Sequence, residues 1–223
     1  MRILKFAFRR ETAMPVLALA LASAASVALL GARIVSTGNL RYSFLAWNLF
    51  LAWLPLMFAL LACDRYESAS GRSWGFLGLA SAWLLFFPNA PYLVTDFYHL
   101  GWRPPMPLWY DIGLIAVFAF TGCFLAIASL RTMHLLVDEY LGGFVGWLFV
   151  LIALGMAGLG VYLGRFGRWN SWDVLIHPRS LLKEIALQVL NPLDNLGFVG
   201  FTLMFTSIMV VFYLMFVSSK PRS

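Results

Sequence analysis

Residues 109–130 read WYDIGLIAVFAFTGCFLAIASL, a run in which Asp111 is the only formal charge. A helix needs about 20 apolar residues to cross a bilayer core of roughly 30 Å. The whole chain has the same character, because 61% of its 223 residues are hydrophobic and 12% are charged, against about a quarter charged in soluble proteins. The sequence therefore predicts an integral membrane protein with one span at this stretch.

Similar apolar runs recur along the chain. They extend for twenty residues without the apolar–polar alternation of a transmembrane β-barrel, and two cysteines exclude a disulfide scaffold. We expect an all-α integral membrane protein in which residues 1–223 form a single transmembrane domain, a six-helix bundle. The expected spans are 12–33, 42–63, 74–94, 109–130, 141–163 and 196–217.

The third expected span is interrupted by Pro88-Asn89-Ala90-Pro91. Residues 74–87 reach only about 21 Å as a helix, and each proline lacks an N–H and biases the preceding residue away from helical angles. We expect a broken third helix whose Asn89 bonds within the bundle, since an unpaired amide in hydrocarbon is costly. Broken helices often mark sites in membrane proteins, although a packed proline kink is the alternative.

An amphipathic segment precedes the sixth span. Between residues 180 and 190, one helical face carries Leu181, Leu182, Ile185, Val189 and Leu190. This pattern predicts an interfacial helix that lies on the membrane.

Four basic residues ahead of the first span predict its orientation: Arg2, Lys5, Arg9 and Arg10. Positive residues remain on the cytoplasmic side, so an even number of spans places both termini in the cytoplasm. The apolar run continues to Val35, which favours an uncleaved signal anchor over a cleaved signal peptide. Residues 96–108 and 164–195 then share the extracytoplasmic face.

The first of these outer segments carries Asp96 and His99, three residues apart. In a helix the two side chains share one face. Such a pair supplies two metal ligands, or a base and its orienting carboxylate. In the alternative reading, Asp96 caps a helix end and His99 forms hydrogen bonds at the interface.

The second outer segment carries Arg165 and Arg168. Arginines at this spacing form a clamp for phosphate or carboxylate, or they interact with a helix C-terminus and lipid headgroups. Asp173 pairs with His177 at a spacing of four, but Asn170 and Asp173 also resemble a helix N-cap with its acidic third residue.

Together these residues predict one extracytoplasmic site, because ionisable groups near membrane depth are usually functional. Asp111 belongs to the same end of the bundle, although an acid in the first turn of a helix is also favoured by the helix dipole. The expected catalytic residues are Asp96, His99, Asp111 and Asp173, with Asp96 and His99 as ligands of a divalent metal ion. The expected substrate-binding residues are Asn89, Arg165, Arg168, Trp169, Asn170 and Trp172.

Charged residues at the cytoplasmic face, among them Arg131, His134 and Asp138, are expected in solvated loops.

At these positions the sequence resembles the DUF1361 family of bacterial membrane proteins, which has no established activity. The resemblance rests on Phe87-Pro-Asn-Ala-Pro-Tyr92, Thr95-Asp96, His99-Leu100, residues 107–111 (PLWYD), and Gly164-Arg165 with residues 168–173 (RWNSWD). His177 lies outside this pattern. The resemblance implies a multi-pass protein of the bacterial cytoplasmic (inner) membrane and supports the choice of site.

Three functions fit these observations. The preferred one is a metal-assisted hydrolase or transferase that acts on a lipid or lipid-linked phosphate. The others are a non-catalytic assembly or partner-binding protein and a lipid or small-anion translocase. Membrane lipids are the expected partners, and nucleic acid is not, because the basic N-terminus is explained by orientation. The spacings Gly142/Gly146 and Gly160/Gly164 suit close helix packing within the chain, in a homo-oligomer or with another membrane protein.

Overall fold

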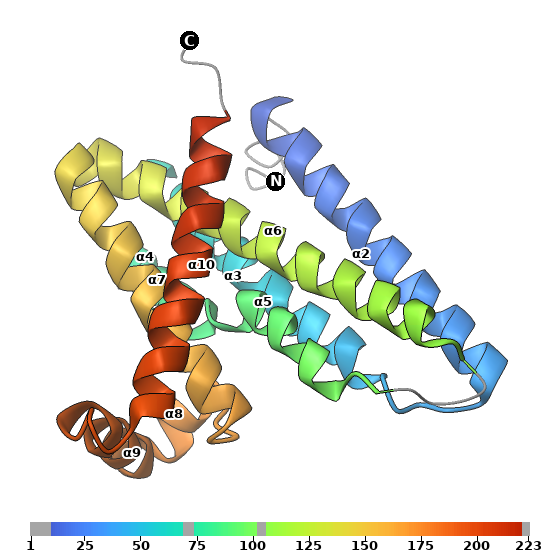
Figure 1. Ribbon diagram of the computed structural model, residues 1–223. Coiled ribbons are helices and arrows are strands. Elements are labelled where there is room, and N and C mark those ends of the chain that lie inside the picture. The colour runs from blue at the N-terminus through green and yellow to red at the C-terminus, as the bar shows by residue number, and fades with distance from the viewer. Residues whose placement is uncertain (1–9, 69–73, 102–105, 220–223) are drawn as a thin grey trace.

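The protein is described here by a computed structural model that covers residues 10–68, 74–101 and 106–219. The basic residues Arg2, Lys5 and Arg9 lie outside this range. The described chain is built from helices (Figure 1). In order they are α2 (Arg10–Thr37), α3 (Phe44–Ser68), α4 (Trp74–Phe86), α5 (Asn89–Tyr92), the 3₁₀ helix η1 (Leu93–His99), α6 (Leu108–Leu141), α7 (Gly143–Arg165), α8 (Asp173–Ile176), α9 (Pro178–Leu190) and α10 (Leu196–Ser218).

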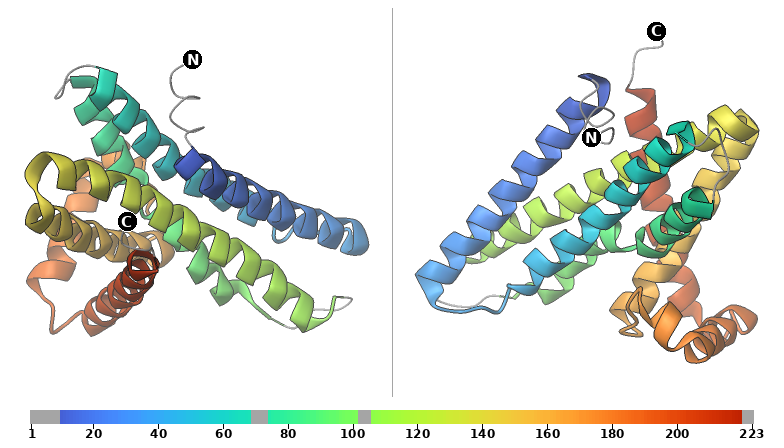
Figure 2. Two further views of the ribbon diagram at one scale, coloured as in Figure 1. Left: turned by 90° about the horizontal axis from the view of Figure 1, so that it is seen from above. Right: turned by 180° about the vertical axis from the view of Figure 1, so that it is seen from behind.

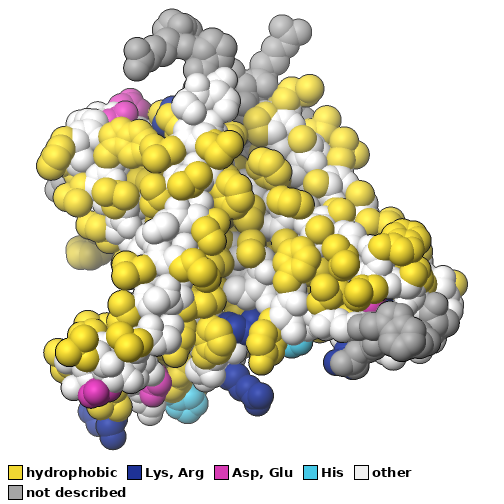
Figure 3. Space-filling view, in the orientation of Figure 1, with side chains coloured by type: hydrophobic (Ala, Val, Ile, Leu, Met, Phe, Trp, Pro, Cys, Tyr) yellow, Lys and Arg dark blue, Asp and Glu magenta, His cyan; other side chains and the backbone are white. Residues whose placement is uncertain are grey.

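Within the described ranges, six helical segments are long and apolar enough to cross a membrane, which confirms the predicted bundle. They are Ala13–Thr37, Phe44–Tyr66, Trp74–His99, Leu108–Leu141, Gly143–Arg165 and Leu196–Ser218. The beginning of α2 and the end of α10 lie at one end of the bundle, and α8 and α9 lie at the other (Figure 1). In Figure 3, hydrophobic side chains cover the middle of the visible face, and charged side chains gather toward its two ends. This distribution suits a molecule whose middle lies in hydrocarbon.

Helix α6 forms the centre of the bundle. It packs against α2, α3, α5, η1, α7 and α10, and Figure 2 shows it crossing the length of the molecule. It buries Leu114, Ile115, Phe118 and Leu125 almost completely. The helix continues to Leu141, well beyond the span expected to end at residue 130, and ends where Gly142 adopts a left-handed φ of 87°.

The third span is broken as predicted. Helix α4 ends at Phe86 and α5 begins at Asn89, and the chain then tightens into η1, which runs below α6 in Figure 1. Asn89 donates from Nδ2 to the Phe86 carbonyl at 3.0 Å and to Ser171 Oγ at 2.9 Å. The predicted bonding of Asn89 within the bundle is therefore confirmed, and it satisfies a carbonyl at the break.

Glycines on two neighbouring helices make room for this broken segment. A Cβ at Gly122 of α6 would collide with the Ala90 carbonyl oxygen, and a Cβ at Gly160 of α7 would lie 2.6 Å from Pro88 Cγ. Gly164, one turn further along α7, faces the Tyr92 ring. The Gly160/Gly164 spacing thus serves close packing within the chain.

Helix α9 is the predicted amphipathic segment and lies across the end of the bundle (Figure 2). Leu181 is buried against the bundle, whereas Leu182, Leu187 and Leu190 are exposed. An exposed apolar face at this position matches a helix that lies in the membrane interface.

Candidate functional site

Arg165, the last residue of α7, joins three side chains of η1. Its Nε donates to Thr95 Oγ1 at 3.0 Å, its Nη2 lies 2.8 Å from Asp96 Oδ1, and its Nη1 lies 2.7 Å from His99 Nε2. Residues three apart lie directly above one another in a 3₁₀ helix, so η1 brings Asp96 and His99 to the same guanidinium. The side chains of Arg165 and Asp96 are 8% and 1% exposed.

The other groups around this cluster complete its hydrogen bonding. Asn48 of α3 donates from Nδ2 to Asp96 Oδ2 at 3.1 Å, so both carboxylate oxygens have a partner. The Arg165 guanidinium also lies 4.9 Å from the centre of the Tyr92 ring, within the range of a cation–π contact. Four elements, α3, α5, η1 and α7, are therefore joined at one buried charge pair.

The contact with Arg165 also determines which nitrogen of the His99 ring can carry a proton. A guanidinium has donors and no acceptor, so His99 Nε2 accepts from Arg165 and carries no proton. The Arg165 guanidinium therefore lies against the Asp96 carboxylate and the His99 nitrogen, the two groups that the sequence predicted as metal ligands. Among the residues the structure describes, no three His, Cys, Asp or Glu side chains come close enough together to hold a metal ion.

Asp111 belongs to a second buried ion pair. Arg33 of α2 contacts its carboxylate in a bidentate geometry, with Nε 2.7 Å from Oδ1 and Nη2 3.2 Å from Oδ2. The two side chains are 4% and 1% exposed. The pair joins the C-terminal end of α2 to the beginning of α6.

Tyr42 connects the two ion pairs. The Arg33 guanidinium lies 4.3 Å from the centre of its ring, and its hydroxyl donates to the His99 carbonyl at 3.3 Å. Burial raises the pKa of Tyr42, and the negative charge of Asp111 raises it further. Tyr42 therefore remains protonated and keeps its role as a donor.

Arg168 and Asp173 lie apart from both pairs. Arg168 is exposed and adopts a left-handed φ of 57°, which turns the chain so that the Trp169 N–H reaches the Leu163 carbonyl at 3.2 Å. Asp173 accepts a hydrogen bond at Oδ2 from the backbone N–H of Asn170 at 2.7 Å. Asp173 is the first residue of α8 and Trp172 is its N-cap, so the expected N-cap at Asn170 is wrong, although the Asp173 carboxylate does bond back to Asn170. The catalytic and binding roles assigned to these residues stay predictions.

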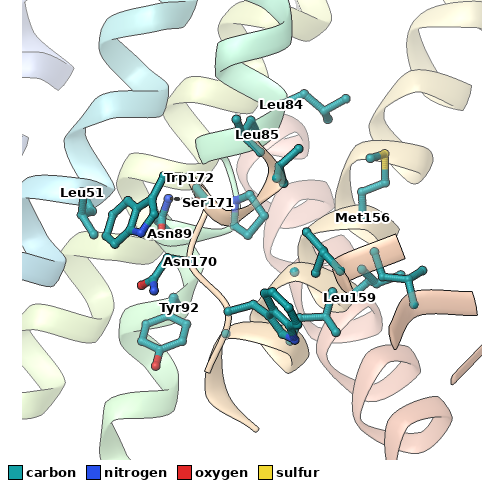
Figure 4. Close-up of a pocket in the computed structure, with 18 of the residues that line it drawn as sticks. Leu51, Leu84, Leu85, Asn89, Tyr92, Met156, Leu159, Asn170, Ser171 and Trp172 are labelled. Carbon is teal, nitrogen blue, oxygen red and sulfur yellow. Dashed lines mark hydrogen bonds between the residues drawn. The ribbon is translucent and has the colours of Figure 1, made fainter. Parts of the chain in front are cut away.

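A cavity of about 450 Å³ lies beside the Arg165 cluster. Its walls come from α3, α4, α5, α7, residues 169–172, α8 and α9. Four of the expected substrate-binding residues line it: Asn89, Trp169, Asn170 and Trp172. Figure 4 shows Asn89, Tyr92, Asn170 and Ser171 toward one side of the cavity, with Leu84, Leu85 and Met156 toward another. The cavity therefore has a polar part and an apolar part.

Arg33 and Asn48 are among the residues of these clusters that sequence reasoning missed. Arg33 lies at the end of the first expected span, and an arginine at such a position usually extends its side chain to the lipid headgroups. Asn48 is a lone amide in the second span, and a polar side chain in an apolar helix was the signal that could have revealed it.

A further polar cluster lies near the opposite end of α6, and it corrects the expectation of solvated loops there. His134 is 2% exposed, its Nδ1 lies 2.6 Å from Tyr213 Oη, and its ring packs edge-on against Trp147. Arg131 and Asp138 are also helical, because α6 continues to Leu141. Hydropathy predicted only the end of the apolar run at residue 130, whereas α6 continues as a helix through the polar residues to Leu141.

The six apolar helices, with buried ion pairs at one end of the bundle, define a multi-pass α-helical membrane protein. The chain belongs to the family described as "Protein of unknown function (DUF1361)", which matches it over residues 47–213. It matches no curated protein and no solved structure.

Proposed function

We propose that this protein binds one membrane lipid or lipid-linked molecule in the cavity between α3, α4, α7 and α9. The cavity itself carries this proposal. Its volume of about 450 Å³ lies in the range of small-molecule sites, and its lining combines apolar side chains with a few polar ones.

The order of the lining residues along α7 matches the polarity of an amphiphile. Met156 lies nine residues before Arg165, so it is about 13 Å further from the outer end of the helix. Leu159 and Leu163 follow on the way out, and Asn170 and Ser171 lie beyond the helix end. An acyl or prenyl chain would occupy the apolar part beside Met156, and its head group the polar part beside Asn170 and Ser171.

The Arg165 cluster would then position side chains that line this site. Asn48 and Tyr92 line the cavity and also contact the cluster, through Asp96 and Arg165 respectively. Both oxygens of Asp96 and the Nε2 of His99 already have partners, which favours positioning over metal-assisted hydrolysis or group transfer. Among the described residues that line the cavity, none is a carboxylate or an imidazole.

We further propose that the cavity opens at the extracytoplasmic face of a bacterial inner membrane, with both termini in the cytoplasm. The support comes from the basic residues ahead of the first span, which favour a cytoplasmic N-terminus, and from the even number of spans.

Native mass spectrometry of the purified protein in a mild detergent tests the binding proposal. The wild type is expected to retain one lipid per chain. Leu159→Trp fills the cavity and should abolish retention, and Met156→Trp should do the same from the rim. Ile152→Trp is the matched control, because Ile152 is exposed on α7 and lies outside the cavity lining. Loss of lipid from all three variants, or from none, would overturn the proposal.

A further inference from the structure

The polar groups that line the cavity carry no formal charge among the residues described. They are the side chains of Asn48, Ser81, Asn89, Asn170 and Ser171, with the Tyr92 phenol and the indoles of Trp47, Trp169 and Trp172. An amide offers both donors and an acceptor, a hydroxyl offers one donor and two acceptor lone pairs, and an indole offers one donor. Such a lining hydrogen-bonds well to neutral polar groups.

Among the described residues, the lining contains no cation. Arg165 is paired with Asp96, and the Asp173 carboxylate accepts from the Asn170 backbone. Arg168 is exposed and does not belong to the lining. A phosphate or carboxylate head group inside the cavity would therefore lose its water without gaining a cation from the lining, which is unfavourable in a largely apolar cavity.

The arrangement of the aromatic residues points to the shape of the head group. Figure 4 places Trp172 beside Asn89 and Ser171, and Asn170 beside Tyr92. Flat rings packed next to amides can cover the C–H face of a sugar or glycerol unit while the amides bond to its hydroxyls. Asn170 is exposed, and although its Nδ2 donates to Asp173 Oδ2 at 3.4 Å, an amide has a second N–H and an oxygen to offer to a ligand.

From these observations we propose that the bound molecule is a lipid whose head group is uncharged and rich in hydroxyls, such as a glycosyl group. This inference rests on the proposed binding of a lipid in the cavity. The apolar part of the cavity, which includes Leu84, Leu85 and Met156, calls for a lipid-linked sugar rather than a free one.

Competition between lipids with identical tails tests the head-group assignment. Delipidated protein is offered equimolar monogalactosyl-dioleoylglycerol, dioleoylphosphatidylglycerol and dioleoylphosphatidic acid, and the retained species are counted by native mass spectrometry. The galactolipid is expected to exceed each anionic lipid at least tenfold, a preference of about 1.4 kcal/mol. Free galactose in excess should not displace it.

A charge introduced at the cavity supplies the matched test. Asn170→Lys should shift the preference toward phosphatidic acid, because it adds the cation that the lining lacks. Asn191→Lys makes the same change at the exposed end of α9, outside the lining, and should leave the preference unchanged.

The outcomes separate the two proposals. Retention of one anionic lipid, blocked by Leu159→Trp, would overturn the neutral head group and keep the lipid site. Equal retention of the three lipids, or displacement by free galactose, would also overturn the head-group assignment. Failure to retain any lipid would overturn the proposed function itself.

Discussion

Replacement of Arg165 by methionine should destabilise the protein strongly. The change removes the contacts with Thr95, Asp96 and His99 and keeps an unbranched apolar side chain of similar length. Asp96 is 1% exposed and would retain only the hydrogen bond from Asn48. Removal of one partner from a buried pair costs about 3 to 5 kcal/mol, because the remaining charge is left in a low-dielectric environment.

A second substitution separates the uncompensated charge from lost packing. In the double variant Asp96→Leu/Arg165→Met neither charge remains, so most of the lost stability should return. Arg168→Met is the matched control, since Arg168 is exposed and makes no ion pair with a described residue. Its effect should be within about 0.5 kcal/mol.

Thermal unfolding in one detergent, followed by tryptophan fluorescence, ranks the four proteins. We expect wild type and Arg168→Met to unfold together, the double variant somewhat earlier, and Arg165→Met much earlier. If Arg165→Met is as stable as the wild type, the ion pair does not hold these helices together. If the double variant is no more stable than Arg165→Met, lost packing rather than the uncompensated charge explains the lower stability of Arg165→Met.

Three other predictions concern different parts of the molecule. Arg33→Met should cost a similar 3 to 5 kcal/mol, measured in the same unfolding assay, and replacement of its acidic partner by leucine in the same chain should restore most of it. Gly122→Leu should prevent the broken third helix from packing on α6 and lower the yield of folded protein in size-exclusion chromatography, whereas Gly113→Ala, which meets open space, should be neutral or stabilising by up to about 1 kcal/mol. In a background with both native cysteines replaced by alanine, a membrane-impermeant maleimide should label Tyr98→Cys and not Leu141→Cys in intact cells; the reverse pattern would invert the topology.

The two buried ion pairs explain how acids are tolerated at this end of the bundle. An isolated carboxylate in a membrane protein is costly, and here each one faces its own arginine across a helix interface. Arg33 joins α2 to α6, and Arg165 joins α7 to η1. The broken third helix is thereby anchored next to the cavity that we propose as the lipid site.

Local features of the chain were enough to predict much of this architecture. Apolar length defines a span because the hydrocarbon has a fixed thickness, and Pro88 and Pro91 interrupt a helix wherever it packs. The spacing of Asp96 and His99 predicts a shared face, and η1 provides it. The amphipathic pattern before the last span likewise predicted α9. Each of these inferences needs only neighbouring residues and the solvent around them.

The partners of the polar residues were decided by the way the helices pack. Arg33 is 78 residues from Asp111, and Arg165 is 69 residues from Asp96. Such pairs depend on the rotation and crossing of helices, and inside a bilayer these follow from small residues that let backbones approach rather than from hydropathy. Gly122 and Gly160 admit the broken segment and so determine which side chains meet. The cavity arises in the same way, because its walls come from helices that are distant in the chain and adjoin only after packing.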